Sequence, residues 1–240
     1  MAQDPTARGK LYLIPTTLGD TEPLEVLPIS IKRAIEQVDH YIVENEKSAR
    51  RFIKKISPRK SQPGLHLEVL NKYTEEEVIP SFLKPCFDGY DVGILSEAGS
   101  PGIADPGAAV VKIAHEKGIQ VVPLVGPSSI ILALMASGMN GQNFAFNGYL
   151  PIEANERKSA IKLLEKRSRE LQQSQIFIET PYRNDKLFAE LCKTLSTGTL
   201  LCIACDITLS TEYIATKPMG KWRTETPNFH KRPAIFIIQG

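Results

Sequence analysis

Short apolar stretches alternate with segments of helical periodicity along the first half of the chain, and this alternation most constrains the fold. Residues 30–38 carry apolar side chains at helical spacing, with Ser30 placed to cap the helix. Helices are also expected at 46–56, 74–87 (capped by Thr74) and 104–118, and strands at 10–16, 40–44, 66–71, 91–96 and 119–124. Strands that alternate with helices in this way are typical of a mostly parallel, doubly wound sheet.

The second half continues the alternation after the Gly126-Pro127 step. Helices are expected at 127–137, 155–171 and 184–195, and strands at 175–180, 200–207 and around 212–216 and 234–238. A chain of 240 residues is long enough for two domains, and a Gly-Pro step suits the hinge between them. We therefore predict an α/β protein with domains at residues 1–125 and 126–240.

Composition excludes several classes of protein. The net charge of +2 does not indicate a nucleic-acid partner for the chain as a whole. No apolar run approaches the ~18–20 residues of a membrane span, and the N-terminus MAQDPTARGK is polar, so we expect a cytoplasmic protein without a membrane partner. Cys202 and Cys205 point to opposite faces of an expected strand, and the histidines lack metal-ligand spacing, so no metal is expected.

Three loops follow expected strands, where parallel sheets bind their ligands. Residues 15–20 (PTTLGD) are compatible with a ligand contact or with an ordinary turn. Residues 96–107 hold three glycines and two prolines, more than a plain turn needs, and favour a shaped binding surface. Residues 123–134 place two serines at a helix N-terminus, where they bind a ligand or simply cap the helix. No catalytic triad can be assembled, which leaves group transfer that relies on positioning.

Three glutamates lie at the carboxyl ends of expected strands: Glu44, Glu97 and Glu179. Each is a candidate general base for a hydroxyl acceptor, and each could instead cap a helix or form a salt bridge. Glu97 is the first choice because it lies in the glycine-rich loop.

Basic residues cluster in two expected helices, at 46–60 and 155–170. Such stretches suit phosphate contacts, although solvated helix faces look similar. Arg50, Arg51 and Lys54 are the candidate RNA contacts in the first of them.

The segments LYLIPTTLGDTEPL, GILSEAGSPGIADPGAAVVKIAHEKGIQVVPLVGPSSIILALMASGM, NFAFNGYLP and IFIETPYRNDKLFAEL resemble the tetrapyrrole methylase superfamily of S-adenosylmethionine-dependent methyltransferases. Within it they are most similar to the branch that methylates a cytidine ribose 2′-hydroxyl in ribosomal RNA of the small subunit. The resemblance implies two α/β domains, the second with a mixed sheet. It also implies S-adenosylmethionine in the cleft between the domains, a homodimer, and ribosomal RNA or the small ribosomal subunit as partner.

The resemblance also implies which positions bind the cofactor. These lie in the three loops and at the strand ends of the second half: Pro15, Leu18, Gly99, Ser100, Ile103, Ser128, Ser129, Ile130, Ile178, Ala204, Cys205 and Ala234. Tyr182 and Arg183 match a substrate segment of the RNA-methylating branch, with Tyr182 in place of a histidine.

The chain departs from that branch in three places. Residues 43–50 read VENEKSAR where the branch carries an Ala-Glu-Asp-Thr-Arg run, Tyr182 replaces a histidine, and no small C-terminal domain follows the last strand before Gly240. Two other functions therefore stay open beside RNA methylation. One is a small-molecule methyltransferase that acts on a tetrapyrrole-like ring, and the other is a non-catalytic protein that binds S-adenosylmethionine.

Overall fold

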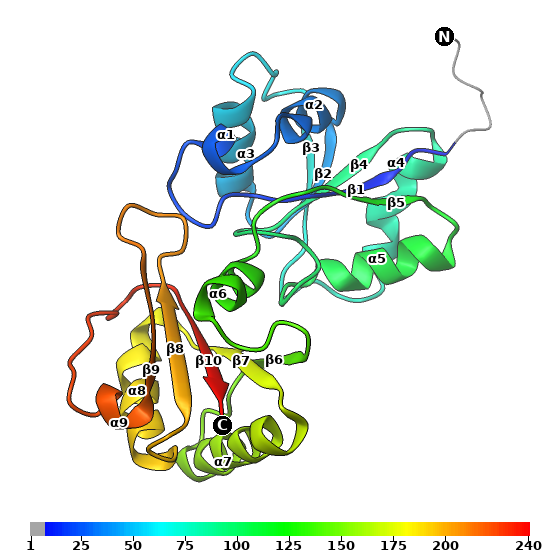
Figure 1. Ribbon diagram of the computed structural model, residues 1–240. Helices are drawn as coiled ribbons and strands as arrows, with labels where there is room; N and C mark the ends of the chain where they lie inside the picture. Colours follow the sequence, from blue (N-terminus) through cyan, green and yellow to red (C-terminus); the bar gives the residue numbers. More distant parts are fainter. Residues whose placement is uncertain (1–7) are drawn as a thin grey trace. The chain divides into compact units, whose positions relative to one another are not determined.

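The chain divides between Pro127 and Ser128 into two compact units, which we call the N-terminal and the C-terminal unit. The sequence placed the boundary two residues earlier. The computed structural model describes residues 8–240 (Figure 1), so the polar N-terminal residues 1–7 lie outside the described part. Among residues 8–240, no helix has both the length and the apolar character needed to cross a membrane.

The N-terminal unit is built on one sheet of parallel strands. Its strand order is β3-β2-β4-β1-β5, and every neighbouring pair runs parallel. The strands are β1 (Leu11–Ile14), β2 (His40–Val43), β3 (His66–Val69), β4 (Val92–Leu95) and β5 (Val121–Pro123). Since all five strands run the same way, the loops that follow them leave from one edge of the sheet.

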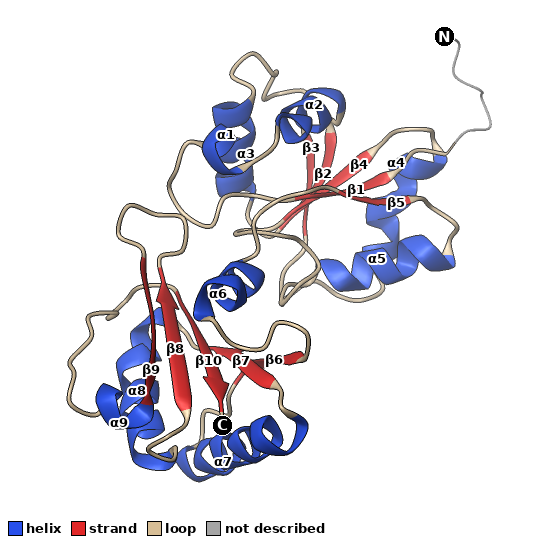
Figure 2. Ribbon diagram, viewed as in Figure 1, coloured by secondary structure: helices blue, strands red, loops and turns tan. Residues whose placement is uncertain are grey.

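Helices cover both faces of this sheet (Figure 2). One apolar cluster joins the sheet to α2 and α3, and a second joins it to the 3-10 helix η1, α4 and α5. The helices are α1 (Pro23–Val26), α2 (Ile29–Gln37), α3 (Glu46–Ile56), η1 (Ile79–Leu83), α4 (Lys84–Phe87) and α5 (Gly107–Glu116). The predicted doubly wound architecture is therefore confirmed.

Two local predictions in this unit are wrong. The helix expected at 74–87 is divided into η1 and α4, each with a proline in its first turn, because Pro80 and Pro85 cannot donate helix hydrogen bonds. Thr74 caps nothing, and its hydroxyl instead accepts from the Asn71 N–H in a turn. The N-cap of α2 is Pro28, so Ser30 lies inside the helix.

The C-terminal unit has a mixed sheet. Its order is β6-β7-β10-β8-β9, in which β6 and β7 are parallel and the other pairs antiparallel. The strands are β6 (Phe144–Tyr149), β7 (Ser174–Ile178), β8 (Leu200–Cys205), β9 (Tyr213–Pro218) and β10 (Ala234–Gln239). The helices are α6 (Ser129–Ser137), α7 (Ala154–Leu171), η2 (Pro181–Arg183), α8 (Asn184–Thr194) and α9 (Met219–Trp222).

The core of the C-terminal unit lies between the sheet and α7, α8 and α9. Its largest side chain is Trp222, which is fully buried and donates its indole N–H to the Leu201 carbonyl oxygen at 2.8 Å. Cys205 belongs to this core, whereas Cys202, three positions away in β8, points to the opposite face of the sheet. Both thiols are free and buried, and among residues 8–240 no group of side chains is arranged to hold a metal ion.

Candidate functional site

The first two loops singled out by the sequence meet at the carboxyl edge of the N-terminal sheet. The Thr16 N–H donates to the Gly99 carbonyl at 3.0 Å, and the Thr16 hydroxyl donates to the Ser96 carbonyl at 3.2 Å. The Ser96 hydroxyl in turn donates to the Gly99 carbonyl at 2.6 Å. These bonds hold the loops after β1 and β4 against each other.

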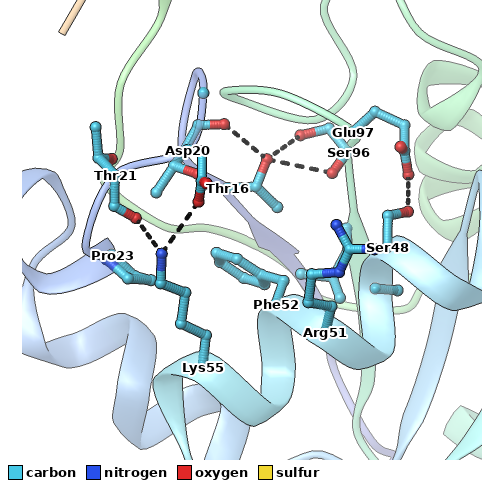
Figure 3. Close-up of a pocket in the computed structure, with 14 residues that line it drawn as sticks. Thr16, Asp20, Thr21, Pro23, Ser48, Arg51, Phe52, Lys55, Ser96 and Glu97 are labelled. Carbon is cyan, nitrogen blue, oxygen red and sulfur yellow. Dashed lines mark hydrogen bonds and ion pairs between the residues drawn. The ribbon is translucent and has the colours of Figure 1, made fainter. Parts of the chain in front are cut away.

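A cavity of about 270 Å³, which we call the α3 cavity, lies beside this junction. Its walls are residues 16–23 of the first loop, one face of α3, and residues 95–97 at the end of β4 (Figure 3). All of these residues belong to the N-terminal unit, so the cavity is described within that unit alone.

The face of α3 that lines the cavity follows helical spacing. Ser48, Arg51, Phe52 and Lys55 lie at positions i, i+3, i+4 and i+7 and all contact the cavity. The core stripe of the same helix is Ala49, Ile53 and Ile56. Helix α3 therefore joins the core on one side and presents a polar and aromatic stripe on the other.

Glu97 and Glu44, two of the three predicted carboxylates, are close together. Glu97 lines the α3 cavity, is exposed, and accepts a hydrogen bond from the Ser48 hydroxyl at 2.6 Å. The Glu97 backbone N–H donates to the Glu44 carboxylate at 3.4 Å. Burial raises the pKa of Glu44, which the negative charges of Asp105 and Glu97 raise further while the Glu97 N–H lowers it. Of the two carboxylates, only Glu97 lines the α3 cavity and is placed to meet a ligand there.

Glu179, the third predicted carboxylate, is occupied by an ion pair. Its side chain is 3% exposed, and its Oε1 accepts from Arg183 Nη2 at 2.7 Å and Nε at 2.9 Å. The Thr180 N–H donates to the same oxygen at 2.7 Å. Three donors thus occupy this oxygen, and Arg183 is committed to it. The neighbouring Tyr182 is exposed, with the Lys231 ammonium 5.7 Å from its ring centre.

The basic residues of α3 differ in how they are used. Arg50 pairs with Glu46 at 2.8 Å and donates to the Gln62 carbonyl at 2.6 Å. Arg51 lines the cavity, and within residues 8–240 no carboxylate pairs with it. Lys54 is exposed and does not line the cavity.

A second cavity of about 420 Å³ lies on the other side of the glycine-rich loop, and we call it the glycine-loop cavity. It is lined by residues 100–103, by Leu13 at the end of β1 and by Leu124 after β5. Ser100 and Ile103, which the resemblance assigns to the cofactor, both face it. Ser100 also donates its hydroxyl to the Pro127 carbonyl at 3.2 Å.

Two glycines shape this loop. At Gly99, with φ of +75°, a Cβ would lie 3.0 Å from Leu18 Cδ2 and 3.1 Å from the Pro127 carbonyl oxygen. Leu18 and Gly99 are therefore in contact, as two residues of one cofactor site would be. Gly102, with φ of +83°, has nothing within 4 Å of its Cβ position, so backbone there is open to a ligand. A cavity of this size and lining fits a nucleoside-containing cofactor.

Three of the predicted cofactor residues belong to the third loop: Ser128, Ser129 and Ile130. A fourth, Pro15, begins the first loop. Pro15 is buried and packs closely on Gly126, where a Cβ would lie 2.2 Å from the proline Cβ. Ser128 is the N-cap of α6 but makes no side-chain cap bond. The simple capping role that the sequence left open is therefore not the role of this hydroxyl.

The remaining predicted cofactor residues are neighbours in the C-terminal sheet. Ala234 pairs with Cys205 across β10 and β8, while the next residue, Ile235, pairs with both Ala204 and Ile178. Residues far apart in the sequence are thus placed side by side at one end of this sheet.

Sequence reasoning missed several residues of the α3 cavity: Thr16, Ser48, Phe52, Lys55 and Ser96. The signal for those on α3 was present, because Ser48, Phe52 and Lys55 repeat at helical spacing opposite the apolar stripe. Lys55 is held by the Thr21 carbonyl at 2.9 Å and by two carboxylates, Asp20 and Glu22, each at 3.3 Å. It therefore anchors the first loop to α3.

A two-unit α/β fold with ligand-sized cavities at the loop edge of a parallel sheet is suited to an enzyme that binds and positions small molecules. The profile of the tetrapyrrole (corrin/porphyrin) methylases matches residues 10–221. The chain belongs to this family, and it is an S-adenosylmethionine-dependent methyltransferase, as the sequence predicted.

Curated relatives agree with this assignment, and solved structures show the same fold. The chain is 27% identical to the ribosomal RNA small subunit methyltransferase I of Escherichia coli O157:H7, over 98% of this chain and 79% of that protein. It is 28% identical to the protein of the same name from Haemophilus influenzae, over 97% of this chain and 79% of that protein. The methyltransferase CobJ has the same fold, with a TM-score of 0.65, 15% identity and coverage of 97% and 94%. The uroporphyrin-III-C-methyltransferase of Thermus thermophilus also has this fold, with a TM-score of 0.55 and 17% identity. The match covers 97% of this chain and 92% of that chain.

Proposed function

We propose that this methyltransferase methylates a ribose 2′-hydroxyl of ribosomal RNA in the small subunit. Relatives that are named as methyltransferases of small-subunit ribosomal RNA match nearly the whole chain. The observation in the structure that carries the proposal is the α3 cavity, which is lined by both the Glu97 carboxylate and the Arg51 guanidinium. A carboxylate can accept the proton of the reacting hydroxyl, and a guanidinium can bind the phosphate backbone of the RNA.

The cofactor of the proposal is S-adenosylmethionine. In the N-terminal unit, Leu18, Gly99, Ser100 and Ile103 would hold it from the first two loops, with the glycine-loop cavity as the space beside them. When bound, it supplies a methyl group on a positively charged sulfur, a group that a nucleophile takes in line.

Glu97 is the general base of the proposal. A ribose hydroxyl is a weak nucleophile, and transfer of its proton to a carboxylate as the new C–O bond forms lowers the barrier. The Ser48 hydroxyl donates to Glu97 and so fixes the direction in which the carboxylate points. Glu179 is left out of this role because Arg183 neutralises it.

Three further expectations belong to the proposal. Tyr182 is exposed and is a candidate contact for the RNA, whereas Arg183 acts through Glu179. The protein is expected to act in the cytoplasm. It is also expected to form a homodimer, by resemblance to its family.

Transfer of a labelled methyl group to small ribosomal subunits tests the function. The subunits are isolated from cells that lack this gene, and the modified nucleotide is mapped by its resistance to alkaline cleavage. We expect label on one ribose oxygen. Label on a tetrapyrrole and none on the subunits would support the small-molecule alternative. Binding of S-adenosylmethionine without transfer to either would support the non-catalytic alternative.

Glu97→Gln tests the base. The amide still accepts from Ser48 but takes no proton, so we expect kcat to fall by about 10²–10⁴-fold. The affinity for S-adenosylmethionine, measured by calorimetry, should stay within about twofold. Glu44→Gln is the matched control, since Glu44 does not line the α3 cavity. A larger loss in the Glu44 variant than in the Glu97 variant would exchange the two roles.

A further inference from the structure

We infer that the α3 cavity is the subsite of a single acceptor ribonucleotide, in which Arg51 binds the phosphodiester next to the reacting ribose. This inference rests on the proposed function and deepens it. It assigns Glu97 and Ser48 to the ribose 2′-hydroxyl, Arg51 to the neighbouring phosphate, and Phe52 to the face of the sugar or base.

The charges of the cavity support this assignment. Among the described residues that line it, two are basic, and they are in different states. Lys55 is held by the Thr21 carbonyl and by the carboxylates of Asp20 and Glu22. Arg51 is exposed and has no carboxylate partner within residues 8–240, so its donors remain for a ligand. A guanidinium presents paired N–H groups that match phosphate oxygens.

The spacing on α3 supports it as well. Ser48 and Arg51 are three residues apart, so their Cβ atoms lie about 5–6 Å from each other on one helix face. In a ribonucleotide, the 2′-hydroxyl and the 3′-phosphate are carried by adjacent sugar carbons. One helix face can therefore bind both groups, with Ser48 directing Glu97 to the hydroxyl and Arg51 reaching the phosphate.

The size and the aromatic lining of the cavity limit the ligand. Its volume of about 270 Å³ is near the lower end for small-molecule sites, which suits one nucleotide unit and not a stacked pair. Phe52 lies between Arg51 and Lys55 on the cavity wall (Figure 3). An aromatic face at that position packs against a sugar or a base without selecting its sequence.

One loop borders both cavities, and the proposal assigns one reactant to each. Ser96 and Glu97 line the α3 cavity, whereas residues 100–103 of the same loop line the glycine-loop cavity. The loop thus borders both the proposed acceptor nucleotide and a cavity lined by predicted cofactor residues, so both reactants are held at one loop. Glu97 lies in the part of the loop that faces the acceptor side, where a proton must be taken.

Arg51→Gln is the test, with Arg33→Gln as the matched control. Both substitutions replace one exposed arginine of the N-terminal unit, in α3 and in α2 respectively, but only Arg51 lines the cavity. In the labelled methyl-transfer assay on small subunits, we expect KM for the subunit to rise about tenfold in the Arg51 variant and kcat to change little. The Arg33 variant should stay within about twofold of the unsubstituted protein. Arg51→Lys should recover part of the loss.

Salt dependence separates a phosphate contact from a structural effect. Loss of one phosphate contact lowers the slope of log kcat/KM against log salt concentration by about one. We expect this change for Arg51→Gln and not for Arg33→Gln, with equal melting temperatures for both.

Three results would overturn the inference or the function beneath it. An unchanged KM and salt slope in the Arg51 variant of an active protein would refute the inference and leave the proposed function standing. Equal increases of KM in both variants would refute the specific contact and indicate general electrostatic attraction of the RNA by positive charge. Absence of methyl transfer to RNA by the unsubstituted protein would remove the proposed function and the inference together.

Discussion

Arg183→Gln is expected to destabilise the C-terminal unit without touching the proposed acceptor site. The substitution removes two hydrogen bonds, of 2.7 and 2.9 Å, from a Glu179 side chain that is 3% exposed. Removal of one partner of a buried ion pair costs about 3–5 kcal/mol. Because the Arg183 side chain is 35% exposed and the Thr180 N–H still binds the carboxylate, we expect about 2 kcal/mol.

The single tryptophan of the chain makes this measurable. Trp222 is fully buried in the core of the C-terminal unit, so its fluorescence reports the unfolding of that unit. With a urea m-value of about 1.5 kcal/mol/M, a loss of about 2 kcal/mol lowers the unfolding midpoint by about 1.3 M.

Two further variants isolate the ion pair. Lys186→Gln removes an exposed positive charge from the following helix, α8, and should leave the midpoint unchanged. Glu179→Gln combined with Arg183→Gln replaces the uncompensated carboxylate by an amide, and it should recover stability relative to Arg183→Gln alone. A midpoint for Arg183→Gln equal to that of the unsubstituted protein would refute the reasoning and return Arg183 to the candidate RNA contacts.

The remaining predictions concern the loop edge of the N-terminal sheet. Gly99→Ala should lower the free energy of unfolding by about 3 kcal/mol and Gly102→Ala by about 1–2 kcal/mol. Both glycines have positive φ, but only the methyl group added at Gly99 would meet Leu18 and Pro127. Equal losses of stability, measured by far-ultraviolet circular dichroism, would contradict this. Glu44 has a raised pKa in the folded protein, so its ionisation opposes folding as pH rises through that pKa. Glu44→Gln should therefore be more stable than the unsubstituted protein at pH 7, with the gain vanishing below the ordinary carboxyl pKa of about 4.3, and a gain that persists at pH 3 would argue against this cause.

The layered architecture could be predicted because its signals are local. Apolar stretches located α3, the strands of the N-terminal unit and β7 to β10 of the C-terminal unit, but not β6, and the Gly126-Pro127 step fell beside the division between the units. The helix expected at 74–87 failed because the apolar spacing was given more weight than Pro80 and Pro85, which interrupt the backbone hydrogen bonds.

The site was predictable by loop and not by side chain. The closeness of Glu44 and Glu97 could be predicted because parallel strands bring their carboxyl ends to one edge of the sheet. The hydrogen bond from Ser48 to Glu97 joins α3 to the loop after β4, and the ion pair of Glu179 depends on how the turn after β7 folds back. Such pairings are set by tertiary packing, so the sequence alone could not tell which carboxylate is neutralised.

Strand order also determines when each unit can be completed during translation. Strand β1 lies between β4 and β5, and Leu11 pairs with Val121, so the first strand to leave the ribosome waits for nearly the whole unit before both its neighbours exist. In the C-terminal unit the last strand, β10, lies between β7 and β8. Until it is synthesised, those strands lack their common partner and expose unpaired backbone groups. The nascent protein therefore passes through two periods of vulnerability to aggregation, each of which closes only when the final strand of a unit emerges.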